Sequence, residues 1–210
     1  MTDTFGDLVN SIANASRRFS MSAEIVNCIY SAIEEYEPRR FFFNETRDTT
    51  FSLSASQAVY TSADHSMIPR FMEIDRFEIT RTVNDRFGLQ KKAYTWVEEW
   101  NETNSSSEPS AYAYYGQTFH VTRPDGGYAV RVSGIVQLAS LSASTDQNAW
   151  TERGNGKELI KQNALARLYS EYLRDDQNAT RAQAREMRAL SRLEQRTTGL
   201  QATGTIEPCL

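Results

Sequence analysis

The sequence predicts a mixed α+β protein: a helical bundle, built from N-terminal helices and a C-terminal helix pair, with an inserted antiparallel β module and an extended C-terminal tail. Apolar residues recur at helical spacing near both ends of the chain. Short segments rich in aromatic and β-branched residues, separated by turn-formers, fill much of the middle. We therefore expect one α+β domain over residues 1–196, with the β module at about 40–82 and 117–138 and the tail at 197–210.

Two amphipathic helices are predicted first. Residues 5–19 and, more strongly, residues 22–36 place apolar side chains on one stripe, and Ser22 is available as the N-cap of the second helix. Pro38 ends that helix, because proline has no backbone N–H to donate and the residue before it avoids the helical region.

The β module is predicted to begin with three consecutive phenylalanines. In the stretch RFFFNE, a strand would place Phe41 and Phe43 on the core face and Phe42 on the other face. The stretches TTFSLS and QAVYTS are short and separated by turn-forming residues, which is typical of a β-meander. MIPRFMEIDRFEITRTV continues as one or two further strands.

A helix and a hairpin are predicted next. LQKKAYTWVEEWNE returns to helical spacing, with an apolar face of Leu89, Ala93, Trp96, Val97 and Trp100. TNSSSEPS, residues 103–110, is a loop. The segments on either side of RPDGG alternate in polarity, and proline followed by glycine favours a tight turn, so we expect a hairpin there. Its inward residues would be Phe119, Val121, Tyr128, Val130, Val132 and Ile135.

Two helices and the tail complete the predicted pattern. Residues 156–173 form a helix, and Asp175 or Asp176 caps a last helix that runs to about Arg196. The remaining stretch, TTGLQATGTIEPCL, contains glycines, threonines and a proline and should be extended.

Composition narrows the class of protein. The formal charge of -4 argues against a protein whose main task is to coat nucleic acid. The chain has no run of about 18 apolar residues, and its N-terminus lacks the layout of a signal peptide, so we expect no membrane partner. Two cysteines, Cys28 and Cys209, fit a reducing compartment, and we expect the chain to be cytoplasmic when made.

The motifs of catalysis and metal binding do not occur in the sequence, so we expect no catalytic, cofactor-binding or metal-binding residues. His65 is a predicted loop residue, and His120 is a surface or pairing residue on a strand. The adjacent carboxylates at 34–35 and 98–99 point about 100° apart on a helix, so neither pair converges on one substrate atom. A hydrolase built from carboxylates that are distant in the sequence stays open.

The last helix carries the most regular polar pattern in the chain. Its arginines recur at spacings that keep them on one side of the helix: Arg181, Arg185, Arg188, Arg192 and Arg196. Two interpretations stay open. One is a partly solvated helix at the edge of the domain. The other is a helix that projects from the core and docks on an acidic partner, because a long helix poor in large apolar residues needs another source of stability. That partner is either a protein, which the net negative charge favours, or the phosphates of DNA.

The tail allows two interpretations as well. It carries the apolar residues Ile206 and Leu210 near its end. It is either an unstructured terminus or an extended segment that lies along a neighbouring subunit by strand addition or groove binding. In the second case Ile206 and Leu210 join the five arginines as partner-docking residues.

Four segments, taken in order, resemble the head-to-tail adaptors of tailed phages, the connector proteins that dock below the portal. They are AIEEYEPRRFFFNE, TTFSLSASQAVYTSADHSMIPRFMEIDRFEI, PSAYAYYGQTFHVTRPDGGYAVRVSGIVQLASLS and ELIKQNALARLYSEYLRDDQNATRAQAREM. The resemblance covers residues 20–195, and its most specific wording is Arg-Phe-x-Phe-Asn-Glu at residues 40–45. The chain departs from the family in YTSADHSMIP, where Pro69 comes later than usual.

The resemblance implies a non-enzymatic virion protein of the neck between head and tail, made in the host cytoplasm. It implies a homo-dodecameric ring that binds the portal protein and receives tail or nozzle proteins. Double-stranded DNA would pass through the ring's channel without sequence-specific binding, and no cofactor is implied. The alternatives are a cell-wall hydrolase acting during phage entry and another structural protein of the tail or neck.

Overall fold

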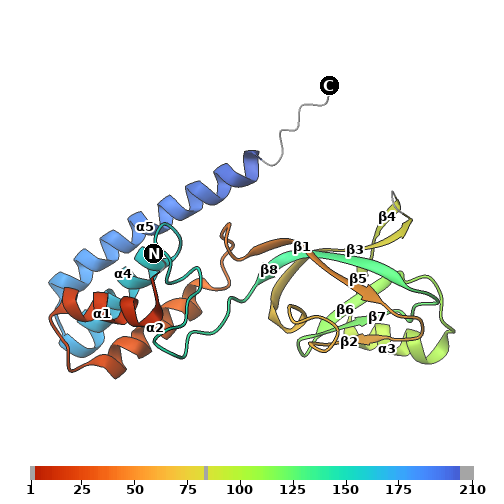
Figure 1. The fold of residues 1–210 in the computed structure, drawn as a ribbon, viewed down its shortest axis with the longest axis horizontal. Coiled ribbons are helices and arrows are strands. Elements are labelled where there is room, and N and C mark those ends of the chain that lie inside the picture. Colours follow the sequence, from red (N-terminus) through yellow and green to blue (C-terminus); the bar gives the residue numbers. More distant parts are fainter. Residues whose placement is uncertain (1–2, 83–84, 204–210) are drawn as a thin grey trace. The chain divides into compact units, whose positions relative to one another are not determined.

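A computed structural model describes residues 3–82 and 85–203, and it divides into two compact units. Unit 1 comprises Met1–Asn44 and Leu138–Leu210, and unit 2 comprises Glu45–Gln137 (Figure 1). Unit 1 is helical and unit 2 contains the strands, so the predicted α+β class, a helical bundle with an inserted β module, is confirmed. The expectation of a single domain over residues 1–196 stays a prediction.

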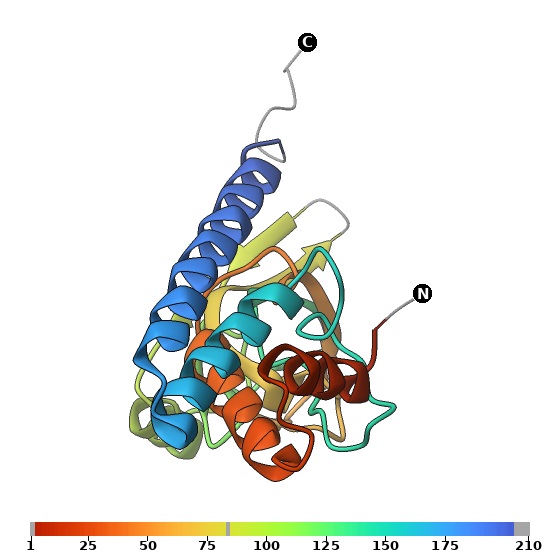
Figure 2. The same ribbon diagram turned by 90° about the vertical axis from the view of Figure 1, so that its left-hand side faces the viewer.

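Unit 1 is built from helices packed around α4. Figure 2 shows α4 between α5 and α1, and α4 also packs against α2. The elements are α1 (Phe5–Ser16), α2 (Ser22–Tyr36), α4 (Lys157–Arg167), a π-helical continuation η2 (Leu168–Leu173) and α5 (Asp176–Thr203). The fully buried residues of their shared core include Leu8, Ile12, Ile25, Ile29, Leu159 and Ile160.

Local capping sets the ends of the first two helices. At the start of α1, Thr4 and Asp7 form a capping box: the Asp7 N–H donates to Thr4 Oγ1 (3.1 Å) and the Thr4 N–H donates to Asp7 Oδ2 (2.9 Å). The helix ends before the predicted residue 19, because Arg17 adopts a left-handed conformation with φ of 56°. Helix α2 has the predicted bounds, but Ser22 is its first residue and Met21 is the N-cap, so the predicted cap was wrong.

The predicted strand at RFFFNE was also wrong, since strand β1 begins only at Glu45. Phe41–Asn44 forms a turn in which the Asn44 N–H donates to the Phe41 carbonyl (3.1 Å). The Asn44 side chain is buried and accepts from the Phe41 N–H (2.7 Å), while its amide donates to the carbonyls of Glu37 and Arg39. These hydrogen bonds satisfy polar backbone groups around the turn. They therefore compete with the hydrogen bonds that a strand at these residues would form with a neighbouring strand.

The phenylalanines still enter the core, though with a different geometry from that of a strand. Phe41 is buried and stacks on Phe43, with ring centroids 5.4 Å apart. Both rings meet the indole of Trp150 edge to face, at 5.8 and 4.9 Å. Phe42 is partly buried and contacts Phe43 as well. The turn therefore places all three rings in unit 1 instead of on two faces of a sheet.

Unit 2 contains two four-stranded sheets (Figure 1). The strands are β1 (Glu45–Leu53), β2 (Val59–Tyr60), β3 (Phe71–Thr82), β4 (Asp85–Gly88), β5 (Gln90–Lys91), β6 (Ala111–Tyr115), β7 (Thr118–Val121) and β8 (Tyr128–Val136). The first sheet has the order β1-β8-β3-β4 and is antiparallel; the second has the order β2-β7-β6-β5, with β5 parallel to β6. Residues of both sheets share one aromatic core around Phe51, Phe77 and Phe119.

The predicted hairpin around RPDGG does not form. Strand β7 pairs with β2 and β6, whereas β8 pairs with β1 and β3 in the other sheet. The hairpin instead joins β6 to β7, with Tyr115 opposite Thr118 and positive φ angles at Gly116 (57°) and Gln117 (62°). Most of the predicted inward residues are nonetheless buried: Phe119, Val121, Val130, Val132 and Ile135. The alternation of apolar and polar residues therefore identified the buried face of each strand, but the predicted pairing of β7 with β8 was wrong.

The helix predicted from residue 89 begins later, as α3 (Tyr94–Thr103). Residues 90 and 91 form the short strand β5 against β6, which removes them from the helix. The predicted apolar face is only partly buried: Val97 is fully buried, whereas Trp96 is 37% exposed. The loop predicted at 103–110 is present, since α3 ends at Thr103 and β6 begins at Ala111.

Helix α5 continues to Thr203, past the predicted end at Arg196. The reason is visible at Thr197, which is buried: its Oγ1 donates to the Leu193 carbonyl (2.8 Å) and accepts from the Phe42 N–H (3.2 Å). Residues 197–203 of the predicted extended tail are thus helical. The rest of that tail, residues 204–210, lies outside the described residues.

Candidate docking surfaces

Helix α5 positions the predicted arginines, and Asp175 starts it. The Asn178 N–H donates to Asp175 Oδ1 (3.1 Å) and the Asn178 amide donates to Asp175 Oδ2 (2.7 Å). The bond from the Asn178 N–H is the main cause of the lowered pKa of Asp175, and the bond from the Asn178 amide lowers it further. Of the two caps that the sequence allows, Asp175 is therefore the one used.

The buried stripe of α5 is made mainly of small residues, which let it approach α4 closely. Its buried members are Ala179, Ala182, Glu186, Ala189, Leu190, Leu193 and Thr197. Alanine contributes little apolar area, so burial alone stabilises this helix weakly for its length. A polar contact at Glu186 adds a specific attachment.

Glu186 is the acceptor in a buried polar network that joins three helices. The Tyr36 hydroxyl of α2 and the Asn163 amide of α4 (2.7 Å) both donate to it. Asn163 also donates to Glu35 (3.0 Å), and Arg167 pairs with Glu35 (2.7 Å) while donating to Asn163 Oδ1 (2.8 Å). Burial and the carboxylate of Glu186 raise the pKa of Tyr36 above its ordinary value. No local pattern in the sequence signals this network, because its members lie far apart along the chain.

All five predicted arginines are exposed on α5, and they differ in what they contact. Arg196 is attached to its own unit: it donates to the Gly154 carbonyl (2.6 Å), and its guanidinium lies 4.2 Å from the ring centroid of Phe42. Arg188 donates to the Ala184 carbonyl one turn earlier (3.1 Å). Across residues 3–82 and 85–203, the side chains of Arg181, Arg185 and Arg192 form no hydrogen bond or ion pair.

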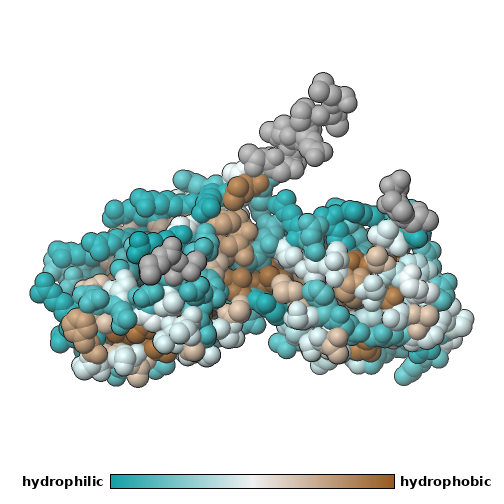
Figure 3. Space-filling view, in the orientation of Figure 1, coloured by the Kyte–Doolittle hydropathy of each residue, from teal (hydrophilic) through white to brown (hydrophobic). Residues whose placement is uncertain are grey.

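We call Arg181, Arg185, Arg188 and Arg192 the arginine face. No carboxylate is interleaved with it, since Glu186 is buried and Glu194 lies on another side of the helix, 4.0 Å from Arg39. Figure 3 shows hydrophilic side chains along the exposed side of α5. The structure therefore places these arginines on one side of α5, as predicted, and exposes them to solvent, while their docking role stays a prediction. The other predicted docking residues, Ile206 and Leu210, lie outside the described residues.

Helix α3 carries a surface that the sequence did not predict. Trp96 and Trp100 stack with ring centroids 5.4 Å apart and an interplanar angle of 21°. With Glu99 and Thr103 they line a shallow groove of about 210 Å³. We call these four residues the tryptophan face. The spacing of the two tryptophans had indicated a core stripe, but Trp96 is exposed and Trp100 is only partly buried.

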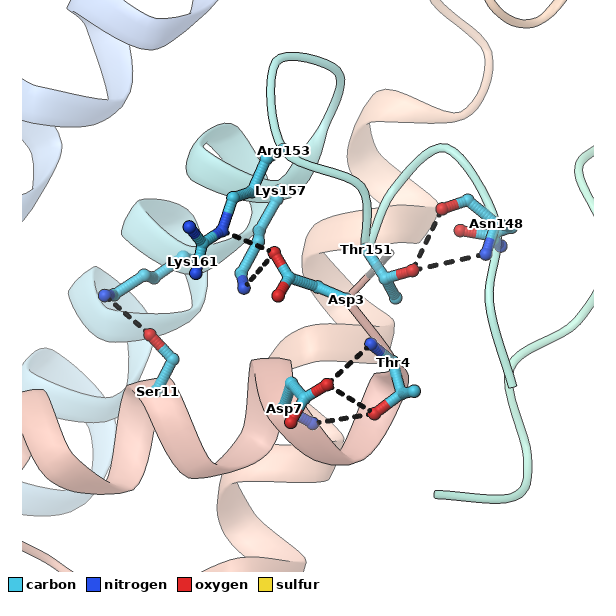
Figure 4. A network of polar contacts seen from close by, with 9 residues as sticks. All are labelled: Asp3, Thr4, Asp7, Ser11, Asn148, Thr151, Arg153, Lys157 and Lys161. Carbon is cyan, nitrogen blue, oxygen red and sulfur yellow. Dashed lines mark hydrogen bonds and ion pairs between the residues drawn. The ribbon is translucent and has the colours of Figure 1, made fainter. Parts of the chain in front are cut away.

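A polar network ties the N-terminal segment to α4 (Figure 4). Asp3 Oδ2 accepts from Lys157 Nζ and from Arg153 Nε, both at 2.8 Å, and Lys161 Nζ donates to Ser11 Oγ (2.7 Å). The bond from Lys157 is the main cause of the lowered pKa of Asp3. The basic residues line a groove of about 1040 Å³. Because they are paired with Asp3 and Ser11, we interpret the network as structural.

The exposed face of the first sheet carries charges of both signs. A concavity of about 660 Å³ lies there, lined by Glu45, Arg47, Asp75, Arg76, Glu78, Arg86, Arg131 and Ser133. Arg131 pairs with Asp48, and Arg76 pairs with Glu78 (3.2 Å). Charges of both signs neutralise each other locally, so this face does not select a strongly charged ligand.

The two histidines lie in ordinary surroundings. His120 is partly buried on β7, where its Nε2 is 2.9 Å from Thr118 Oγ1, and burial lowers its pKa. His65 accepts from the Met67 N–H through Nδ1 (3.2 Å). Among residues 3–82 and 85–203, no three or more His, Cys, Asp or Glu side chains gather so as to hold a metal ion. No helix in the described part of the chain is long and apolar enough to cross a membrane.

Comparison with known proteins agrees with the resemblance seen in the sequence. The model of one family, described as SU10 adaptor protein, matches residues 3–207, which is nearly the whole chain. The chain matches no protein with a curated description. The family is one of phage head-to-tail adaptors, which gives the chain a structural role between head and tail. The chain therefore belongs to the SU10 adaptor protein family.

Proposed function

We propose that this chain forms a homo-dodecameric ring that docks on the portal protein, connects it to tail or nozzle proteins in the virion neck, and surrounds part of the DNA channel. The family match over residues 3–207 carries the proposal. Double-stranded DNA passes through the channel without sequence-specific binding, and the protein performs no enzymatic step and needs no cofactor.

Two surfaces contact other protein subunits of the neck in this proposal. One is the set of arginines on α5, which are exposed; among the described residues, Arg196 alone of the five forms a hydrogen bond outside α5. The other is the C-terminal tail with Ile206 and Leu210. An extended terminal segment adds buried area between subunits through main-chain hydrogen bonds and side-chain pockets, which suits the attachment to the portal.

Truncation after Thr203 tests the role of the tail. Removing residues 197–210 would also delete Thr197, whose hydroxyl contacts both Leu193 and Phe42, and would damage unit 1. Removing only residues 204–210 leaves those contacts in place. A chain of full length in which residues 204–210 are scrambled separates the effect of the tail's sequence from that of its length.

Portal binding is measured by co-sedimentation with the purified portal protein of the same phage. The truncated and scrambled chains should keep the far-UV circular dichroism of the intact chain and lose portal binding. Equal binding by all three chains would refute the docking role of the tail. Hydrolysis of purified peptidoglycan by the intact chain would contradict the non-enzymatic role.

A further inference from the structure

The tryptophan face of α3 needs an explanation that the fold does not supply. Trp96, Glu99, Trp100 and Thr103 lie on one side of the helix, at spacings of three and four residues. Trp96 is 37% exposed and Trp100 is partly buried. Tryptophan is strongly enriched among the residues that dominate binding at protein interfaces. The stacked pair therefore indicates an interaction surface.

The charges of α3 indicate the sign of the partner. The helix contains Glu98, Glu99 and Glu102, all exposed, and no lysine or arginine. The Tyr94 hydroxyl donates to Glu98. In the part of the chain that the structure describes, the carboxylates of Glu99 and Glu102 form no hydrogen bond or ion pair. A cationic group is the natural ligand of this face.

The combination of indoles and a carboxylate favours arginine in particular. A guanidinium is planar, stacks on aromatic rings and binds a carboxylate through two N–H groups. A cation already contacts one of the indoles, since Lys92 Nζ lies 5.7 Å from the ring centroid of Trp96. The groove beside Glu99 offers a second place where a guanidinium can lie against indole and carboxylate together.

The same chain carries a matching surface on α5. The arginine face has four guanidinium groups, spaced three and four residues apart, without an interleaved carboxylate. Because both surfaces are helical, Arg185 and Arg188 are separated along α5 by the same rise, about 4.5 Å, as Glu99 and Glu102 along α3. Two helices lying side by side can therefore pair these groups in register.

We propose that the arginine face of one copy binds the tryptophan face of the next copy. The inference rests on the proposed ring. The two faces belong to different elements of one chain, so each copy offers one of each. Such a heterologous contact repeats head to tail and closes into a ring when the rotation between copies permits. An arginine face that bound only the portal protein or DNA phosphates would leave the tryptophan face without a role.

Charge reversal on either side tests the contact. Glu99→Arg in the tryptophan face, combined with Glu102→Arg three residues further along α3, makes both faces positive. Arg185→Glu/Arg188→Glu makes both faces negative. Neither variant can pair with itself, whereas an equal mixture forms alternating contacts, each between opposite charges. Matched controls change the net charge equally on exposed residues elsewhere: Glu34→Arg/Glu194→Arg and Arg17→Glu/Arg18→Glu.

Assembly is followed by mass photometry, both on purified portal rings and with the chain alone at high concentration. Each face variant should need at least about tenfold more chain to complete the ring, because like charges oppose each other at every contact. The equal mixture should return to the concentration that the wild-type chain needs, and the controls should match the wild type. Far-UV circular dichroism verifies that every variant is folded.

The possible failures are distinguishable. Normal rings from both face variants, or folded variants whose mixture does not recover, would overturn the contact while leaving portal docking intact. Loss of binding to short double-stranded DNA, with normal rings, would assign the arginine face to nucleic acid and equally overturn the contact. A wild-type chain that binds no portal protein would refute the proposed function. In that case, ring assembly that is restored by mixing the two face variants without portal protein would still support the contact.

Discussion

One buried carboxylate, Glu186, takes part in the attachment of α5 to the rest of unit 1, and its removal should be costly. In Glu186→Ala, the Tyr36 hydroxyl loses its acceptor and the Asn163 amide keeps only Glu35. Leaving a buried donor unsatisfied costs about 1–3 kcal/mol, and here two donor groups lose an acceptor, so we expect Glu186→Ala to lower the free energy of unfolding by about 2–6 kcal/mol. Tyr36→Phe removes one hydrogen bond to a charged acceptor and should cost about 1.5–3 kcal/mol.

A double variant separates the loss of the hydrogen bond between Tyr36 and Glu186 from a loss of packing at residue 186. In Tyr36→Phe/Glu186→Ala the donor and the acceptor are removed together, so the cost should fall below the sum of the costs of Tyr36→Phe and Glu186→Ala by about 1–2 kcal/mol. Glu194→Ala is the matched control on the same helix, because Glu194 is 57% exposed and its contact with Arg39 is 4.0 Å long. We expect it to lie within about 0.5 kcal/mol of the wild type.

Urea denaturation followed by far-UV circular dichroism is the suitable assay, because most helical residues belong to unit 1. A cost for Glu186→Ala no larger than that for Glu194→Ala would show that small-residue packing alone holds α5. Additive costs in the double variant would show that Tyr36 and Glu186 act independently. Either result would refute the reasoning.

Three further predictions follow from backbone geometry and from charge. Gly134→Ala should destabilise unit 2 by more than about 3 kcal/mol in thermal unfolding, because a Cβ there would lie 2.0 Å from the Glu73 carbonyl oxygen, whereas Gly88→Ala, with nothing within 4 Å, should be nearly neutral. Gln117→Asn should raise the free energy of unfolding by about 0.5–1 kcal/mol, because asparagine tolerates the positive φ of the β6–β7 turn better than glutamine; an unchanged or lower value in urea would contradict this. Unit 1 should lose stability in acid, since hydrogen bonds lower the pKa of four of its carboxyls: Asp3, Asp7, Asp146 and Asp175. The contribution of these carboxylates to the free energy of unfolding is present above the ordinary pKa of 3.8 and disappears as pH falls through the lowered pKa values. The urea midpoint of Asp175→Asn should therefore fall less than that of the wild type between neutral and acid pH.

Local signals predicted the helices of unit 1 well. Residues 22–36 emerged with the observed bounds, because one apolar stripe and a proline just beyond it act within a few residues. The common side of the α5 arginines was predicted for the same reason: a helix places residues three and four apart on one side. Arg196 behaves differently from its neighbours only because Gly154 and Phe42, distant in sequence, lie beside it.

The tryptophans of α3 mark the limit of periodicity as a guide. Their spacing was interpreted as a core face, yet Val97 is the buried residue of that helix and Trp96 is exposed. An apolar stripe on a short helix is buried only where another element covers it, and the stripe itself does not identify that element. The face that we propose as a docking surface therefore became visible only in the structure.

By itself, the sequence determined the α+β class, the helical faces and the alternating residues that enter the sheets, because these depend on periods of two and 3.6 residues within one segment. The tertiary structure decided which strands pair, that Phe41–Asn44 turns instead of extending, and how far α5 continues. The physical reason is the range of the contacts. β8 lies between β1 and β3, Asn44 is satisfied by carbonyls before it, and Thr197 is held by Phe42, so each outcome depends on groups that no single segment contains.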